Sequence, residues 1–83
     1  MSKFYLFRIV VQTPEHGEMV GNWSERLTAE EIVQGKKHIL GNWGDLTYLS
    51  LQVGEDEVIV PAEVLRRSIT RLEVRRWDEG EME

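Results

Sequence analysis

Apolar and polar positions near the start of the chain follow a strand pattern. Residues 4–11 (FYLFRIVV) are rich in aromatic and β-branched side chains, and both of their alternating faces are largely apolar, which is typical of a central strand. The segment TPEHG follows, in which Pro14 and Gly17 favour a turn. Residues 18–23 are therefore predicted to return as a second strand.

The spacing changes to that of a helix after residue 28. In the segment TAEE, Thr28 and Glu31 have the spacing of a capping box, in which each side chain accepts a hydrogen bond from the main-chain amide of the other residue. Apolar residues then recur at helical intervals. We predict a helix over residues 29–40, with Gly41 as the residue just beyond its C-terminus.

Strand patterns return in the second half of the chain. Residues 48–53 alternate between apolar and polar, GEDE is predicted to turn, and residues 58–60 return. Pro61 ends that strand and begins a single helical turn over residues 61–65. The segment SITRLEVRRW alternates again, which predicts a last strand with one buried and one charged face.

The element order β-β-α-β-β-β indicates the α+β class. We expect an antiparallel, curled sheet of about five strands with one α-helix packed on it. Residues 1–77 form a single domain in this interpretation, and residues 78–83 (DEGEME) form an acidic C-terminal tail.

The tripeptide GNW occurs twice, at residues 21–23 and 41–43. The segments around the two copies share neither sequence nor period, because one is a strand and turn and the other is a capped helix. Gly21 falls late in a strand, where a glycine indicates a bulge or a close approach, whereas Gly41 ends a helix. We interpret the repetition as coincidence.

Composition excludes several classes of function. The 83 residues include no cysteine, which removes disulfides and thiolate metal sites, and no apolar stretch approaches the length of a membrane span. The two histidines, His16 and His38, have no partner at metal-ligand or catalytic spacing. We therefore expect a soluble, cytoplasmic protein that is not an enzyme, with no catalytic residue, no cofactor, no metal and no membrane partner.

Arginine is concentrated near the C-terminus, although the net charge is −5. Five of the ten Lys and Arg residues fall within eleven positions: Arg66, Arg67, Arg71, Arg75 and Arg76. On a strand, Arg67, Arg71 and Arg75 would project from one face. That face could be solvated and neutralised by Glu73 and the acidic tail, or it could recognise an anion or an acidic protein surface.

Trp23, Trp43 and Trp77 all lie at the ends of predicted elements. A tryptophan in that position can close the core, form a platform for a ligand, or anchor an interface. The candidate binding residues are therefore Arg67, Arg71, Arg75, Arg76, Trp77, Trp43 and Trp23.

These features favour a small non-enzymatic protein that docks a protein partner through residues 66–77 and nearby tryptophans, and that forms a homo-oligomer by edge pairing or sheet-face packing. In length, acidity and lack of catalytic motifs the chain looks like the short accessory proteins of phages and mobile elements, some of which inhibit host enzymes. The alternative is a binder of a small anion or nucleotide that uses the Arg66–Arg76 cluster with a tryptophan. A third hypothesis is nucleic-acid binding, against which the net charge counts.

Overall fold

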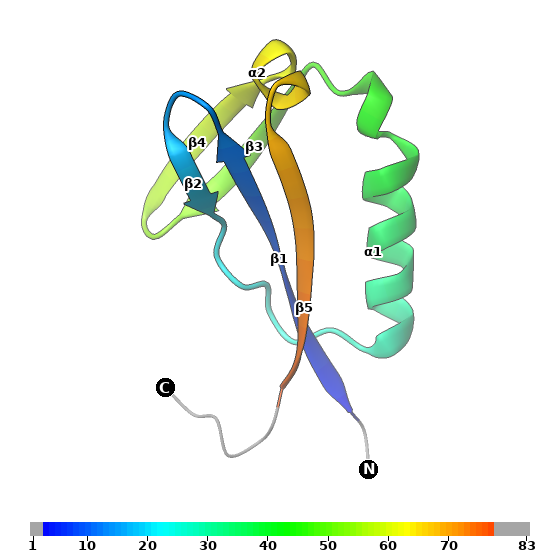
Figure 1. Cartoon of the computed structure of the whole chain (residues 1–83). Coiled ribbons are helices and arrows are strands. Elements are labelled where there is room, and N and C mark those ends of the chain that lie inside the picture. Colours follow the sequence, from blue (N-terminus) through cyan, green and yellow to red (C-terminus); the bar gives the residue numbers. More distant parts are fainter. Residues whose placement is uncertain (1–2, 78–83) are drawn as a thin grey trace.

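The computed structural model describes residues 3–77, which form five strands, two α-helices and one 3-10 turn (Figure 1). In chain order the elements are β1 (Phe4–Thr13), β2 (Gly17–Val20), α1 (Ala29–Gly41), η1 (Trp43–Asp45), β3 (Tyr48–Val53), β4 (Asp56–Pro61), α2 (Ala62–Arg66) and β5 (Ile69–Trp77). The acidic tail predicted at residues 78–83 lies outside the described residues.

The strands form two antiparallel sheets. Sheet A has the order β2-β1-β5, and sheet B consists of β3 and β4. The prediction of an α+β fold is confirmed, as is the central place of β1, but the prediction of one curled, five-stranded sheet is wrong. The physical reason is that β1 takes β5, the last strand, as its second neighbour, which leaves β3 and β4 to pair only with each other.

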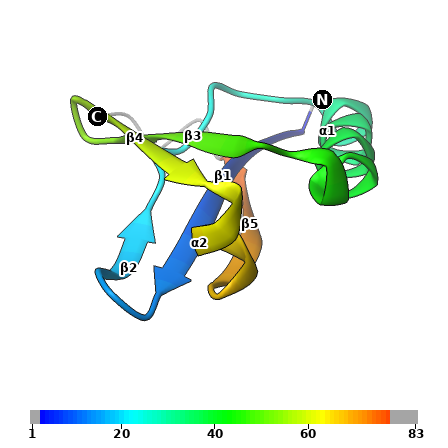
Figure 2. The same ribbon diagram turned by 90° about the horizontal axis from the view of Figure 1, so that it is seen from above.

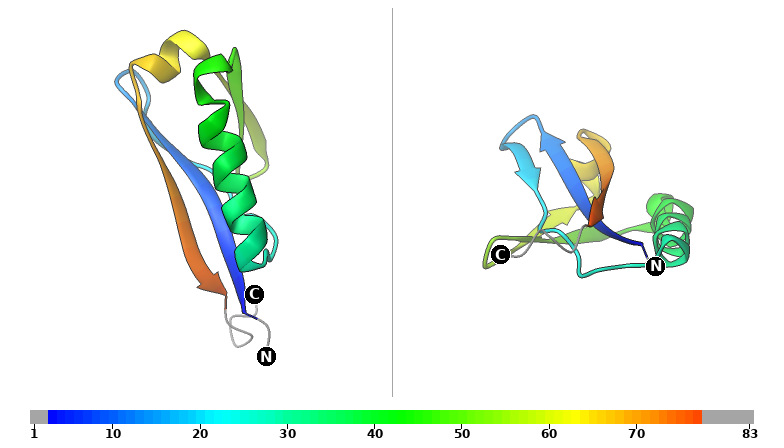
Figure 3. Two further views of the ribbon diagram at one scale, coloured as in Figure 1. Left: turned by 90° about the vertical axis from the view of Figure 1, so that its right-hand side faces the viewer. Right: turned by 90° about the horizontal axis from the view of Figure 1, so that it is seen from below.

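Sheet B and the two helices lie on the same side of sheet A (Figures 2 and 3). The side chains of sheet A that face sheet B form its inner face, and Val11 packs there in a buried cluster with Leu51, Val60 and Leu65. The opposite side of sheet A, on which Val10 lies, is its outer face. Cross-strand partners share a face, so Arg71, which pairs with Val10, also belongs to the outer face.

Helix α1 begins as its sequence predicts. The Thr28 side chain accepts a hydrogen bond from the amide of Glu31, and the Glu31 carboxylate accepts one from the amide of Thr28. The C-terminal prediction is wrong by one residue, because Gly41 is still helical and Asn42 caps the helix. Ile32 is the buried residue of α1.

Glycines with positive φ close the two hairpins. Gly17, at φ 72°, follows a three-residue loop, and Gly54, at φ 64°, opens the two-residue loop between β3 and β4. The turn predicted over residues 54–57 is therefore only Gly54-Glu55, since β4 already begins at Asp56. The second strand is also shorter than predicted and ends at Val20.

The two GNW tripeptides have different structural roles, as expected. The Gly21 amide donates to the Ile9 carbonyl at 2.8 Å, and a Cβ atom at Gly21 would lie 2.8 Å from both that oxygen and Leu51 Cδ1. Asn22 then exchanges two hydrogen bonds with the main chain of Gly54, at 2.8 and 2.9 Å. Asn42, by contrast, donates to the His38 carbonyl at the end of α1.

Replacing Gly21 with alanine should destabilise the protein, because the new methyl group must displace the Ile9 carbonyl or Leu51. We expect Gly21→Ala to lower the free energy of unfolding by about 1–3 kcal/mol. Gly35→Ala is the matched control, since nothing lies within 4 Å of a Cβ at that helical position; it should raise stability by up to about 1 kcal/mol. Urea denaturation of the two variants measures both changes, and equal stability of the two would contradict the close approach at Gly21.

Candidate functional site

The outer face of sheet A carries arginine side chains stacked on aromatic rings. The Arg8 guanidinium lies 4.2 Å from the centroid of the Trp23 ring, and that of Arg75 lies 5.5 Å from the same centroid. Both distances fall within the range of a cation–π contact. Trp23 lies in the segment that follows β2. Its ring contacts Arg8 of β1 and Arg75 of β5.

A second stacked group lies at the end of the same face. Phe4 and Trp77 are directly opposed in the β1–β5 register and make an edge-to-face contact with ring centroids 6.2 Å apart. The Arg26 guanidinium lies 5.0 Å from the Phe4 ring centroid and 4.9 Å from that of Trp77. We call this surface, which comprises Phe4, Arg8, Trp23, Arg26, Arg71, Arg75 and Trp77, the arginine–aromatic face.

Carboxylates fix two of these arginines in place. Glu73 lies opposite Arg8 in the register, and one of its oxygens is 2.7 Å from Arg8 Nε and 2.6 Å from Arg8 Nη2. The other Glu73 oxygen accepts from Arg71 Nε at 2.8 Å, and Arg71 also contacts Glu18 at 3.1 Å. Arg8 and Arg71 are therefore oriented by contacts within the chain.

These contacts shift two pKa values. Hydrogen bonds from Arg71 and then Arg8 lower the pKa of the Glu73 carboxyl below its ordinary value of 4.5. The hydrogen bonds to Glu73 and Glu18 raise the pKa of Arg71. Both shifts favour the charged forms, as expected for groups that are paired with each other.

Four of the residues predicted from the sequence come together here. Arg71 and Arg75 share the outer face of β5, and Trp77 lies at the end of that strand. Trp23 joins them from the segment after β2 through its contact with Arg75. The expectation that Arg71 and Arg75 project from one face is thus met.

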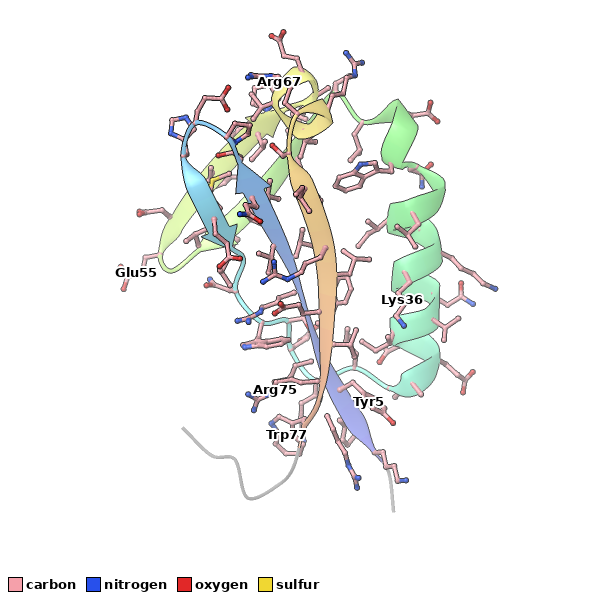
Figure 4. The ribbon with its side chains drawn as sticks, in the orientation of Figure 1. Tyr5, Lys36, Glu55, Arg67, Arg75 and Trp77 are labelled. Carbon is pink, nitrogen blue, oxygen red and sulfur yellow. The ribbon has the colours of Figure 1, made fainter. Side chains whose placement is uncertain are left out.

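The other three predicted residues lie elsewhere. Arg67 does not project from β5, because it caps α2 and precedes the strand; its guanidinium is bonded to Glu15 at the opposite end of the molecule from Arg75 and Trp77 (Figure 4). Arg76 pairs with Tyr5 and so belongs to the inner face. Trp43 packs against the buried cluster, as a core residue.

Three members of the face were not singled out from the sequence: Arg8, Arg26 and Phe4. Arg8 gives a signal, since it is the single charged residue in the largely apolar segment 4–11. Arg26 lies in the segment between β2 and α1, where no periodicity indicates which way a side chain points. Its position depends on Phe4 and Trp77, which come together only through the pairing of β1 with β5.

Within residues 3–77 there is no group of three or more His, Asp or Glu side chains arranged to hold a metal ion. Neither described helix is long and apolar enough to cross a membrane. Comparison with protein-family models, with curated proteins and with solved structures finds no match to this chain.

Because Arg71 provides the largest effect on Glu73, its removal should raise the Glu73 pKa most. We expect Arg71→Ala, and to a smaller extent Arg8→Ala, to return that pKa toward 4.5. A lowered folded-state pKa stabilises the protein above the unfolded-state value, and this contribution is lost as the pH falls through the folded-state value. Carboxyl NMR titration of the wild type and both variants measures the shift, and a Glu73 pKa that neither substitution moves would contradict the geometry.

Proposed function

We propose that the chain is a non-enzymatic docking protein that binds a protein partner through the arginine–aromatic face. The observation that carries the proposal is the stacking of Arg8 on Trp23 and of Arg26 over both Phe4 and Trp77. Tryptophan and arginine are the residue types most enriched among those that dominate binding energy at protein interfaces. Two tryptophans and four arginines on one open sheet face form such a surface.

The ordering of this face also supports docking. A long arginine side chain loses conformational entropy when it is fixed in an interface, at a cost of about 0.5–1.5 kcal/mol for each immobilised side chain. Arg8 and Arg71 are already held by Glu73, and Arg8 is also held by Trp23. Part of that cost is therefore met during folding.

The small-anion alternative is less well supported by the same contacts. Arg8, Arg71 and Arg67 already bind the carboxylates of Glu73, Glu18 and Glu15. A free phosphate or nucleotide would have to displace carboxylates that are held at high effective concentration within the chain. A rise in melting temperature with inorganic phosphate or ATP would favour this alternative over docking.

Nucleic-acid binding is the third candidate. Single-stranded nucleic acids stack their bases on exposed aromatic rings, but two guanidinium groups already lie against Trp23. The net charge of −5 adds repulsion from phosphate. Salt-sensitive binding of mixed single-stranded oligonucleotides, measured by fluorescence anisotropy, would favour this candidate.

The proposal of a homo-oligomer, formed by edge pairing or by packing of sheet faces, stands beside docking. A second copy packed on the arginine–aromatic face would compete with the partner for that face. Sedimentation velocity over a range of concentrations measures this, and we expect Trp23→Ala to weaken any self-association of the wild type. Docking to a second protein could inhibit a host enzyme in the cytoplasm. Identification of the bound partner as an enzyme would support this possibility.

Matched charge reversals test the docking proposal. Arg75→Glu and Lys37→Glu change the net charge equally, but Arg75 lies on the arginine–aromatic face whereas Lys37 is an exposed residue of α1. In affinity capture from the organism that encodes the chain, we expect Arg75→Glu and Trp23→Ala to reduce the recovered partner at least about tenfold. Lys37→Glu should leave recovery unchanged.

The quantity compared is the amount of each captured protein, measured by mass spectrometry. A partner that is recovered equally with all three variants binds some other surface, and that result would contradict the proposal. Far-ultraviolet circular dichroism of each variant shows that the fold is retained.

A further inference from the structure

Strand β5 forms an open edge of sheet A. Among residues 3–77, β1 is the single strand that pairs with β5. The carbonyls of Ile9 and Phe7 accept hydrogen bonds from Gly21 and Ser24, both on the β2 side of β1. Odd-numbered β1 residues therefore direct their main-chain groups toward β2, and even-numbered ones direct theirs toward β5.

The register then assigns the main-chain groups of β5. Even-numbered β1 residues pair with odd-numbered β5 residues, as in Arg8 with Glu73 and Val10 with Arg71. In an antiparallel ladder these are the hydrogen-bonded pairs. Thr70, Leu72 and Val74 consequently direct their N–H and C=O groups away from β1, at the free edge.

A partly apolar stripe runs along α1, the helix that lies beyond the edge of β5 in Figures 1 and 2. Val33, Lys36 and Leu40 are spaced i, i+3 and i+7 and so share one side of the helix. In Figure 4, Lys36 lies on the side of α1 that is turned toward the viewer. Strand β5 is seen in the same view. Val33 is 48% exposed, Leu40 63% and Val74, on the inner face of β5, 39%. A strand added to β5 would cover these side chains.

The charge along this edge is mainly positive, in contrast to the chain as a whole. Arg71 and Arg75 lie on the outer face of β5, and Arg76 and Lys36 lie on the inner side. Glu73 is the one acidic residue of β5, and it is already bound by Arg8 and Arg71. An acidic segment is therefore the electrostatic complement of the edge.

We propose that an extended acidic segment of the partner protein adds to β5 as an antiparallel strand. Its alternate apolar side chains would cover Val74 and the α1 stripe. Its acidic side chains would lie opposite Arg75 and beside Arg71, where they would add to the contacts of Arg71 with Glu73 and Glu18 without displacing them. Its main chain would hydrogen-bond to Thr70, Leu72 and Val74, as in other strand-addition complexes. This inference rests on the proposed docking function and names the chemistry of the partner.

A second copy of the chain fits the edge less well than a single segment. Helix α1 lies beyond the free edge of β5, on the inner side of sheet A (Figures 1 and 2). In a two-fold pair joined through β5, each copy would bring its own α1 against the inner side of the other sheet A. Sheet B already packs there, whereas an isolated strand carries no helix.

The probe is the capped hexapeptide acetyl-Glu-Val-Thr-Val-Glu-Val-amide. Paired antiparallel with residues 70–75, it places glutamates opposite Arg71 and Arg75 and valines over the inner side. Titration into isotope-labelled protein should shift the amide signals of β5, and hydrogen exchange at Thr70, Leu72 and Val74 should slow. A lysine peptide, acetyl-Lys-Val-Thr-Val-Lys-Val-amide, should bind at least about tenfold more weakly.

Matched substitutions at Val74 test the main-chain contact. Val74→Pro removes an N–H that does not bond to β1, so sheet A can form, and it should weaken the glutamate peptide about tenfold through the lost hydrogen bond. Val74→Thr keeps both the N–H and the branched side chain and should change affinity less than about threefold. If Val74→Pro fails to fold, the amide exchange of the wild-type protein still decides the question.

Four results would overturn the inference. The first two are amide hydrogen exchange in β5 that does not change at saturating glutamate peptide, and equal affinity of the protein for the glutamate and lysine peptides. The other two are equal affinity of the two Val74 variants for the glutamate peptide, and self-association of the wild type that Val74→Pro abolishes. Affinity capture separates this failure from failure of the docking proposal. Partner recovery that is lost with Trp23→Ala but retained with Val74→Pro leaves docking in place and removes strand addition. If partner recovery is lost with Val74→Pro but retained with Trp23→Ala, the partner binds the edge of β5 and not the arginine–aromatic face.

Discussion

The arrangement of the whole molecule depends on the close approach at Gly21. The chain leaves β2 there, and its amide bonds to the Ile9 carbonyl while Leu51 of β3 occupies the space that a side chain would need. The next residue continues the junction, because the Asn22 amide donates to the Gln52 carbonyl and the Asn22 side chain bonds to the Gly54 main chain. Sheet B is thus fixed against the inner face of sheet A, and the outer face is left without a second layer.

In the described part of the chain, the outer face has no second layer of strands or helices, although Val10 on that face is fully buried. It must accommodate the charged residue that the central strand carries. Arg8 lies on β1 between β5 and the segment that follows β2, which is an unfavourable place for a charge that has no partner. Glu73 lies opposite it on β5, and Trp23 stacks on its guanidinium. The contacts that satisfy Arg8 also orient Arg71, since both arginines share the Glu73 carboxylate. The order of the outer face is therefore a consequence of satisfying one charge in β1.

Local signals in the sequence predict the elements but not how they associate. The capping box at Thr28, the turn glycines and the strand alternations act over a few residues, and each indicates its element close to where the structure has it. Pairing β1 with β5 joins residues more than sixty positions apart, as Arg8 and Glu73 show, and no local pattern determines which strand becomes the neighbour.

The candidate site shows the same division between local and distant determinants. Arg71 and Arg75 were predicted together because strand alternation is local. Arg67 was misplaced, because the strand spacing was extended to a residue that precedes the predicted strand and that caps α2 in the structure. Trp23 and Trp43 have the same two preceding residues, yet one stacks on arginine and the other packs in the core. Their separation depends on tertiary contacts that the sequence pattern does not encode.

The small core links stability to binding. The radius of gyration is 13.8 Å, compared with about 12 Å for a compact domain of this length, so the molecule is elongated. Within residues 3–77, its buried cluster contains only Val11, Leu51, Val60 and Leu65. A chain of this size already buries only about 60% of its unfolded surface, and the exposed apolar side chains of α1 and β5 leave part of that burial incomplete. A partner that covers them binds the folded state alone and so stabilises it in proportion to its affinity. The strand addition that we propose at the open edge would therefore bury apolar surface that the isolated chain leaves exposed.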